Sequence, residues 1–130
     1  MRYLVDTDWA IHYSRGHEPV RRRLGELRAQ GLGLSIVSLA ELYEGVERST
    51  NPLADETAVQ DFLALVELVG LDAETARIFG RERARLRVAG TPLDGLDLLI
   101  GATALRHDLT LLTNNRRHFD RIGDLAIESV

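Results

Sequence analysis

Three carboxylates stand where short apolar runs of the chain end or begin. Asp6 and Glu41 each follow such a run, and Asp97 directly precedes Leu98-Leu99-Ile100. If these runs are strands and helix starts of one parallel sheet, the acids meet at the carboxyl edge of that sheet. Acidic side chains in one crevice repel one another unless a cation lies between them, and oxygen ligands favour Mg²⁺ or Mn²⁺. The residues therefore predict a divalent metal site.

Each of these acids also has a purely structural explanation. Ser38-Leu39-Ala40-Glu41 fits a capping box, in which Glu41 would accept the backbone N–H of Ser38, and taken alone this role is favoured. Thr91-Pro92-Leu93-Asp94 also fits a capping pattern, so we expect a capping role for Asp94. Asp6 alone could be a turn residue before a helix that Asp8 caps. Only spatial proximity of the three acids can decide between these roles.

A fourth candidate position for the site, made of polar residues, follows the apolar run Leu109 to Thr113. Asn114 and Asn115 suit a turn, but an amide oxygen can also ligate a metal, and Asn115 is the favoured candidate. Thr113 could position a water or a phosphate. Arg116 and Arg117 lie beside the predicted site and could contact a phosphate, although clustered arginines usually form a solvated face.

Other side chains that could take part in chemistry are expected to have structural roles. The four histidines lack the i, i+4 spacing of paired ligands and are expected at the surface or at helix caps; they are His12, His17, His107 and His118. Trp9 is expected in the core. No nucleophile elbow and no glycine-rich phosphate loop occurs.

Length and composition indicate one globular domain over residues 1–130, with 45% apolar residues and no apolar run near the 18 residues of a membrane span. No export leader is apparent, and the absence of cysteine excludes disulfides and fits a cytoplasmic protein. The net charge of −4 argues mildly against a nucleic-acid binder. All 16 basic residues are arginine, however, which suits bidentate phosphate contacts and leaves an RNA substrate open.

Strand-like runs alternate with helical segments along the chain, which predicts an α/β fold with a mainly parallel sheet of four to five strands flanked by helices. The expected strands are 2–5, 34–37, 69–71, 110–112 and 125–127. The expected helices are 8–13, 19–29, 39–48, 55–66, a long one capped by Asp72 and ending near 88, and one from 91–92 to about 107.

The order and spacing of four segments resemble the PIN-domain ribonucleases, specifically the VapC toxins of toxin–antitoxin pairs. These segments are Tyr3 to Asp8, Ser38 to Leu42, Gly90 to Ala102 and Leu112 to Phe119. The resemblance covers nearly the whole chain and implies a three-layer fold and hydrolysis of RNA with Mg²⁺ or Mn²⁺. It also implies that Asp6, Glu41 and Asp97 are the metal ligands.

The resemblance further implies a homodimer and a cognate VapB-like antitoxin that occupies or blocks the active site. Many relatives carry a fourth acid after the fourth strand, where this chain has Asn115. A neutral residue there weakens the case for a second metal, and Asp94 could compensate. The number of metals and the RNA target stay open.

Two other functions compete with this interpretation. Val5-Asp6-Thr7-Asp8 superficially matches the Asp-x-Asp start of aspartyl-phosphate phosphotransfer enzymes, but these generally rely on a lysine, and the chain has none. A catalytically weakened PIN domain could instead act only as a protein-binding module. The retention of Asp6, Glu41 and Asp97 favours the ribonuclease.

Overall fold

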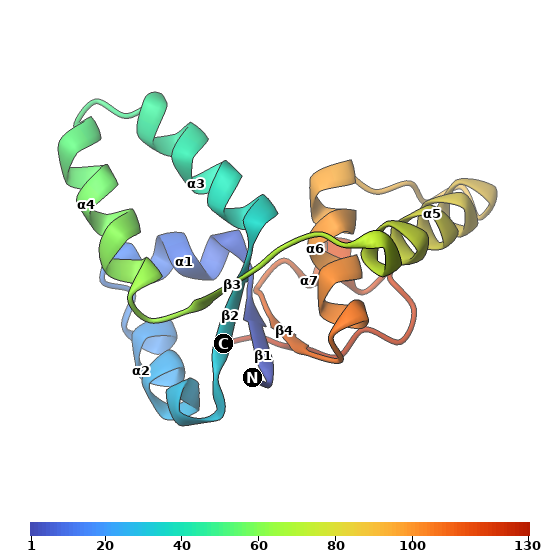
Figure 1. The fold of residues 1–130 in the computed structure, drawn as a ribbon, viewed down its shortest axis with the longest axis horizontal. Coiled ribbons are helices and arrows are strands. Elements are labelled where there is room, and N and C mark those ends of the chain that lie inside the picture. The colour runs from blue at the N-terminus through green and yellow to red at the C-terminus, as the bar shows by residue number, and fades with distance from the viewer.

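One parallel five-stranded sheet runs through the computed structural model, which describes all 130 residues. The strands lie in the order β3-β2-β1-β4-β5, and each neighbouring pair is parallel. Figure 1 labels β1 to β4. Their bounds are β1 (Tyr3–Val5), β2 (Leu32–Ser35), β3 (Glu67–Val69), β4 (Thr110–Leu112) and β5 (Ile127–Glu128). The predicted α/β class with a parallel sheet is confirmed.

Seven α-helices connect these strands: α1 (Thr7–Ser14), α2 (Glu18–Leu27), α3 (Ile36–Glu47), α4 (Pro52–Leu63), α5 (Ala73–Val88), α6 (Gly95–Arg106) and α7 (Arg116–Phe119). A 3₁₀ turn (Arg28–Gln30) follows α2. Asp72 caps α5 as predicted, since its carboxylate accepts the Thr75 N–H at 2.9 Å. None of the helices has both the length and the apolar character needed to cross a bilayer.

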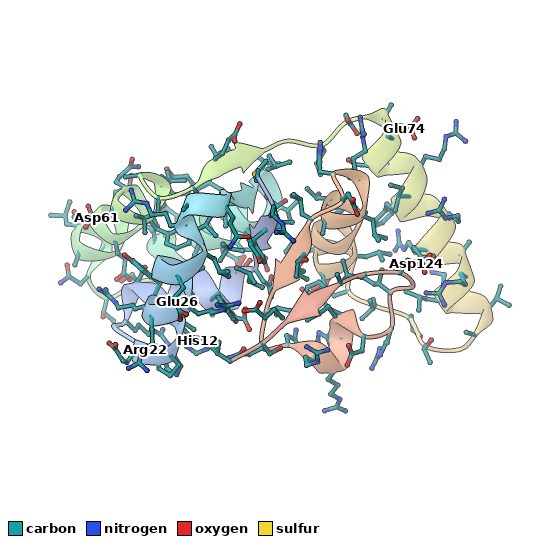
Figure 2. The ribbon with its side chains drawn as sticks, turned by 90° about the horizontal axis from the view of Figure 1, so that it is seen from below. His12, Arg22, Glu26, Asp61, Glu74 and Asp124 are labelled. Carbon is teal, nitrogen blue, oxygen red and sulfur yellow. The ribbon has the colours of Figure 1, made fainter.

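Two hydrophobic cores lie on opposite faces of the sheet. Val5 packs with Trp9 and Phe62 in one core, and the neighbouring Leu4 packs with Ile100 and Phe119 in the other. Successive strand residues point to opposite faces, so β1 contributes to both cores. Figures 1 and 2 show α1, α2 and α4 grouped away from α5, and Figure 2 places Asp61 of α4 and Glu74 of α5 toward opposite ends of the molecule. The result is a three-layer arrangement.

The boundary between β2 and α3 differs from the prediction. The strand covers 32–35 instead of 34–37, and α3 begins at Ile36 instead of Leu39. Ser35 is the N-cap, because its hydroxyl accepts the Val37 N–H at 3.0 Å. The β-branched pair Ile36-Val37 favoured a strand locally, but Val37 packs into the second core as a helical residue. The predicted Ser38–Glu41 capping box is therefore wrong.

Other boundaries shift by a few residues. Strand β3 begins at Glu67 instead of Val69. Glu67 and Leu68 are exposed because β3 lies at the edge of the sheet, so no apolar run in the sequence marks this start. Strand β5 covers 127–128 instead of 125–127. Helix α1 begins at Thr7, so Asp8 lies inside its first turn and is not its cap. Helix α6 begins at Gly95 instead of Thr91-Pro92, with Asp94 as its N-cap.

Candidate active site

The candidate site lies at the carboxyl edge of the sheet, beyond the ends of the central strand β1 and its neighbour β4. Asp6 directly follows β1, and Thr113 directly follows β4. The Asp6 N–H donates to the Leu112 carbonyl at 3.0 Å, which extends the parallel ladder one residue past the strands. This register fixes Asp6 and Thr113 opposite each other.

Asp6 is a buried carboxyl group, with 4% of the residue exposed. The Thr113 hydroxyl donates to Asp6 Oδ2 at 2.7 Å and accepts the Asn115 N–H at 3.0 Å. Burial, and then the negative charge of Asp8, raise the pKa of Asp6 to about 8. An ionised Asp6 is thus unfavourable at neutral pH in the protein without a bound cation.

Glu41 projects from the second turn of α3 toward α1. The Thr7 hydroxyl donates to Glu41 Oε1 at 2.7 Å, and Ser38 Oγ lies 2.9 Å from the same hydroxyl. Burial raises the pKa of Glu41, and the charges of Asp97 and Asp94 raise it further. Because Thr7 directly follows Asp6 in the chain, this contact ties Glu41 to the end of β1.

Asp97 lies in the first turn of α6 and connects to the end of β4 through a histidine. Its Oδ2 is 2.9 Å from His118 Nδ1, and Asn115 Nδ2 is 3.0 Å from the same ring nitrogen. Since a carboxylate only accepts hydrogen bonds, the contact with Asp97 requires a proton on Nδ1. With its proton directed at Asp97, Nδ1 cannot also accept from the Asn115 amide group, so Asn115 and His118 are neighbours without a hydrogen bond between these two nitrogens. The hydrogen bonds run from Thr113 to Asp6, from the Asn115 N–H to Thr113, and from His118 to Asp97.

The remaining predicted residues surround these contacts. The side-chain oxygen of Asn114 accepts hydrogen bonds from Trp9 Nε1 and the Val130 N–H, both at 3.0 Å. Because these contacts hold α1 and the C-terminus in place, the role of Asn114 is structural. Trp9 is fully buried, as expected. Asp94 caps α6 by accepting the Leu96 N–H, so its predicted capping role is confirmed, but as the N-cap itself and not inside a first turn that starts at Thr91-Pro92.

Arg116 and Arg117 differ in the contacts that their side chains make. Arg116 Nη1 lies 3.3 Å from Ser129 Oγ, and Arg116 Nη2 lies 3.7 Å from an Asp120 carboxylate oxygen. Arg117 is exposed. Arg116 is therefore partly occupied by local contacts, whereas Arg117 projects from the surface.

The donor set at this edge matches the chemistry of Mg²⁺ or Mn²⁺, because it consists of carboxylate, hydroxyl and amide oxygens. No three acidic or histidine side chains are gathered closely enough to hold an ion as they stand. Each predicted acid is instead hydrogen-bonded to a partner: Asp6 to Thr113, Glu41 to Thr7, and Asp97 to His118. The raised pKa values of Asp6 and Glu41 nevertheless indicate a site that a cation would stabilise.

Sequence reasoning missed the residues that link these acids. The sequence pattern assigns no role in the site to four of them: Thr7, Asp8, Ser38 and His118. For His118 it predicts a place at the surface or at a helix cap. The Asp8 carboxylate accepts the Asn114 N–H at 3.0 Å. His118 could have been found from its i, i+3 spacing to Asn115, which places both side chains on one face of a helical turn. No comparable spacing marks Thr7 or Ser38.

The PIN domain family model matches residues 3–125. The chain is 31% identical over 129 residues to "tRNA(fMet)-specific endonuclease VapC" of Salmonella typhimurium, covering 98% of this chain and 97% of that protein. It is 35% identical over 124 residues to "Ribonuclease VapC19" of Mycobacterium tuberculosis, covering 94% of this chain and 95% of that protein.

Two solved structures have nearly the same fold. VapBC2 from Rickettsia felis, bound to a DNA fragment from its promoter, superimposes with a TM-score of 0.93 at 28% identity. DNA-bound VapBC from Salmonella typhimurium gives the same TM-score at 30% identity. In both cases the match covers 99% of this chain and 98% of the other.

Proposed function

Because the chain belongs to the PIN-domain family, and within it to the VapC ribonucleases, we propose that it is a metal-dependent endoribonuclease that hydrolyses RNA phosphodiesters. Asp6, Glu41 and Asp97 are its proposed Mg²⁺ or Mn²⁺ ligands. The observation that carries this assignment is the buried Asp6, which is hydrogen-bonded to Thr113 two residues before Asn115, while Asn115 lies beside the His118 that contacts Asp97.

The residues have separate roles in this proposal. A divalent ion, when bound, lowers the pKa of an attacking water and neutralises charge on the phosphate. Asp6 gives up its proton when the site is loaded, because a ligating carboxylate must be ionised. Thr113 orients Asp6, Thr7 orients Glu41, and His118 orients Asp97 through the hydrogen bonds described above. Such supporting contacts fix the direction in which each carboxylate presents its oxygens.

Asn115 occupies the position after β4 where many relatives carry an acid. An amide adds an oxygen donor but no charge, so a second ion is expected to bind more weakly than the first. The Asp94 carboxylate adds to the negative potential at Glu41 but is engaged in capping α6. We therefore assign the fourth polar position to Asn115 and not to Asp94.

Thr113, Arg116 and Arg117 are proposed to lie along the RNA backbone. The net charge of −4 offers no general attraction for RNA, so local arginines must supply it. Exposed Arg117 is better placed for this than Arg116, which is partly engaged with Asp120 and Ser129.

The proposed partners follow from the VapC relatives. Two of the similar structures are VapBC complexes, and we propose that this chain pairs with a VapB-like antitoxin and forms a homodimer. Because the proposed substrate is RNA, we expect the protein to act in the cytoplasm.

The test is cleavage of a mixed tRNA and ribosomal RNA panel by the purified protein with Mg²⁺, with Mn²⁺ and with EDTA. We expect discrete cuts that need metal, disappear in Asp97→Asn, and persist in Asp61→Asn, which alters an exposed carboxylate on α4 (Figure 2). Absence of cutting by the folded protein under either metal contradicts the proposal and favours a protein-binding PIN domain.

A further inference from the structure

Two polar contacts join the start of α6 to α7 and the turn after it, and only one of them lies in the candidate active site. Inside the site, His118 contacts Asp97 at 2.9 Å. Outside it, Arg121 Nη1 donates to the Pro92 carbonyl, also at 2.9 Å. The Arg121 N–H donates to the His118 carbonyl at 3.3 Å, so both side chains extend from one backbone turn. The two contacts therefore bridge the same pair of segments.

The backbone of this turn is anchored to α5. The Arg121 carbonyl accepts a hydrogen bond from Arg85 Nη2 at 2.8 Å, and Arg85 donates to both carboxylate oxygens of Glu82, at 3.0 and 3.1 Å. Glu82 is 6% exposed and also accepts the Gly123 N–H at 3.0 Å. One buried carboxylate on α5 thus holds the turn at two points, on either side of residue 122.

The same turn packs closely against the middle of α6. Ile122 is buried, and a Cβ atom added to Gly101 of α6 would clash with its Cδ1. The turn is therefore fixed, and the Arg121 side chain reaches from it to the segment 91–94 that precedes α6. Its bond to Pro92 is the only hydrogen bond between this segment and a residue outside α5 and α6.

The two contacts respond differently to a bound ion. The inner contact involves a proposed metal ligand and is given up when Asp97 turns from His118 to the ion. The outer contact involves no ligand, so the hydrogen bond from Arg121 to Pro92 remains. It is then the polar contact that still holds the start of α6 against the turn after α7.

We propose that Arg121 is a positioning residue of the metal site, which holds the start of α6 in place so that Asp97 can share a divalent ion with Asp6 and Glu41. The inference rests on the proposed ribonuclease function. Residues that support ligands without touching the metal typically contribute about 10- to 100-fold to metal affinity.

The test is the affinity for Mn²⁺, measured without RNA from the electron paramagnetic resonance signal of the free ion. Arg121→Met keeps the aliphatic stem but removes the donor, and should weaken binding by about tenfold. Arg121→Lys keeps a donor of the same charge and should recover most of this loss. Lost charge alone predicts the opposite sign, because a protein with one positive charge fewer attracts a cation more strongly. Arg22→Ala removes an exposed arginine on α2 (Figure 2) and should not weaken binding.

RNA cleavage separates positioning from contact with the substrate. Arg121→Met should need about tenfold more Mn²⁺ for half-maximal cleavage. Its KM for RNA, and its rate at saturating Mn²⁺, should stay near those of the unaltered protein. An arginine that binds the RNA backbone would instead raise KM for RNA at every Mn²⁺ concentration.

Three results would overturn the inference. The first is an unchanged Mn²⁺ affinity in Arg121→Met, while Asp97→Asn binds Mn²⁺ weakly. The second is a raised KM for RNA with an unchanged requirement for Mn²⁺. The third is an unfolded Arg121→Met protein by circular dichroism in EDTA, because the bond would then support the whole fold and not the site. Equal Mn²⁺ binding by Asp97→Asn and the unaltered protein is a separate outcome, in which the proposed metal site itself fails.

Discussion

Asp6 is buried next to Asp8, and in the metal-free protein its pKa is raised to about 8 from an ordinary value of 3.8. The folded state therefore binds a proton that the unfolded state has lost between about pH 4 and pH 8. Stability of the metal-free protein must fall as the pH rises through this window, by at most about 1.4 kcal/mol per pH unit from this group.

We accordingly predict that Asp6→Asn stabilises the metal-free protein at pH 8 and not at pH 4, because asparagine resembles the protonated carboxyl group and does not titrate. Urea unfolding in EDTA at several pH values measures the difference. With saturating Mn²⁺ the order should reverse, since the metal stabilises only the unaltered protein. A constant difference at all pH values would show that Asp6 ionises normally in the folded state.

Thr113 is the residue that joins the end of β4 to Asp6. Thr113→Val keeps the shape but leaves the Asn115 N–H and Asp6 Oδ2 without this partner, which should lower the free energy of unfolding by about 1–3 kcal/mol. Thr113→Ser retains the hydroxyl and should lose much less. Equal unfolding free energies for the valine and serine variants would mean that the hydroxyl contributes nothing.

At the scale of elements, α3 positions Glu41, and the start of that helix depends on Ser35. Ser35→Ala removes the cap on the Val37 N–H and should destabilise the protein by about 1 kcal/mol. Ser35 is fully buried, so a charged replacement is unsuitable, and Ser35→Thr, which retains the capping hydroxyl, is the matched variant that should recover most of this loss in a urea unfolding experiment. If Ser35→Ala does not lower the free energy of unfolding, α3 does not begin at the Ser35 cap.

Some elements of the site could be predicted from the sequence for a physical reason. The carboxyl ends of parallel strands lie at one edge of a sheet, so the apolar runs alone predict that Asp6 and Asn115 lie near each other. The helix cap at Asp72 was likewise predicted, because capping is a local interaction. The start of α3 was not, since β-branched residues favoured a strand until tertiary packing drew Val37 into the core.

The side chains that connect the acids were beyond sequence reasoning for a different reason. Contacts such as Thr7 with Glu41, or His118 with Asp97, join residues 34 and 21 positions apart. They depend on the crossing of α1 with α3 and on the placement of the four-residue helix α7 against α6.

At the scale of the whole molecule, we predict a homodimer. Light scattering coupled to gel filtration should give twice the 14.5 kDa mass of one chain. A mass that stays at one chain across the concentration range would contradict the dimer while leaving the proposed chemistry of the site intact.

The proposed catalytic metal site is the one that Asp6, Glu41 and Asp97 form together. It is tested most directly by diffraction from crystals soaked in Mn²⁺, with data collected near the manganese absorption edge. We expect an anomalous peak within ligand distance of oxygens of all three carboxylates, roughly 2.0–2.2 Å as for ions of this size, after Asp97 releases His118. A manganese peak bound elsewhere, or none at a concentration that supports RNA cleavage, would contradict the assignment of these three ligands.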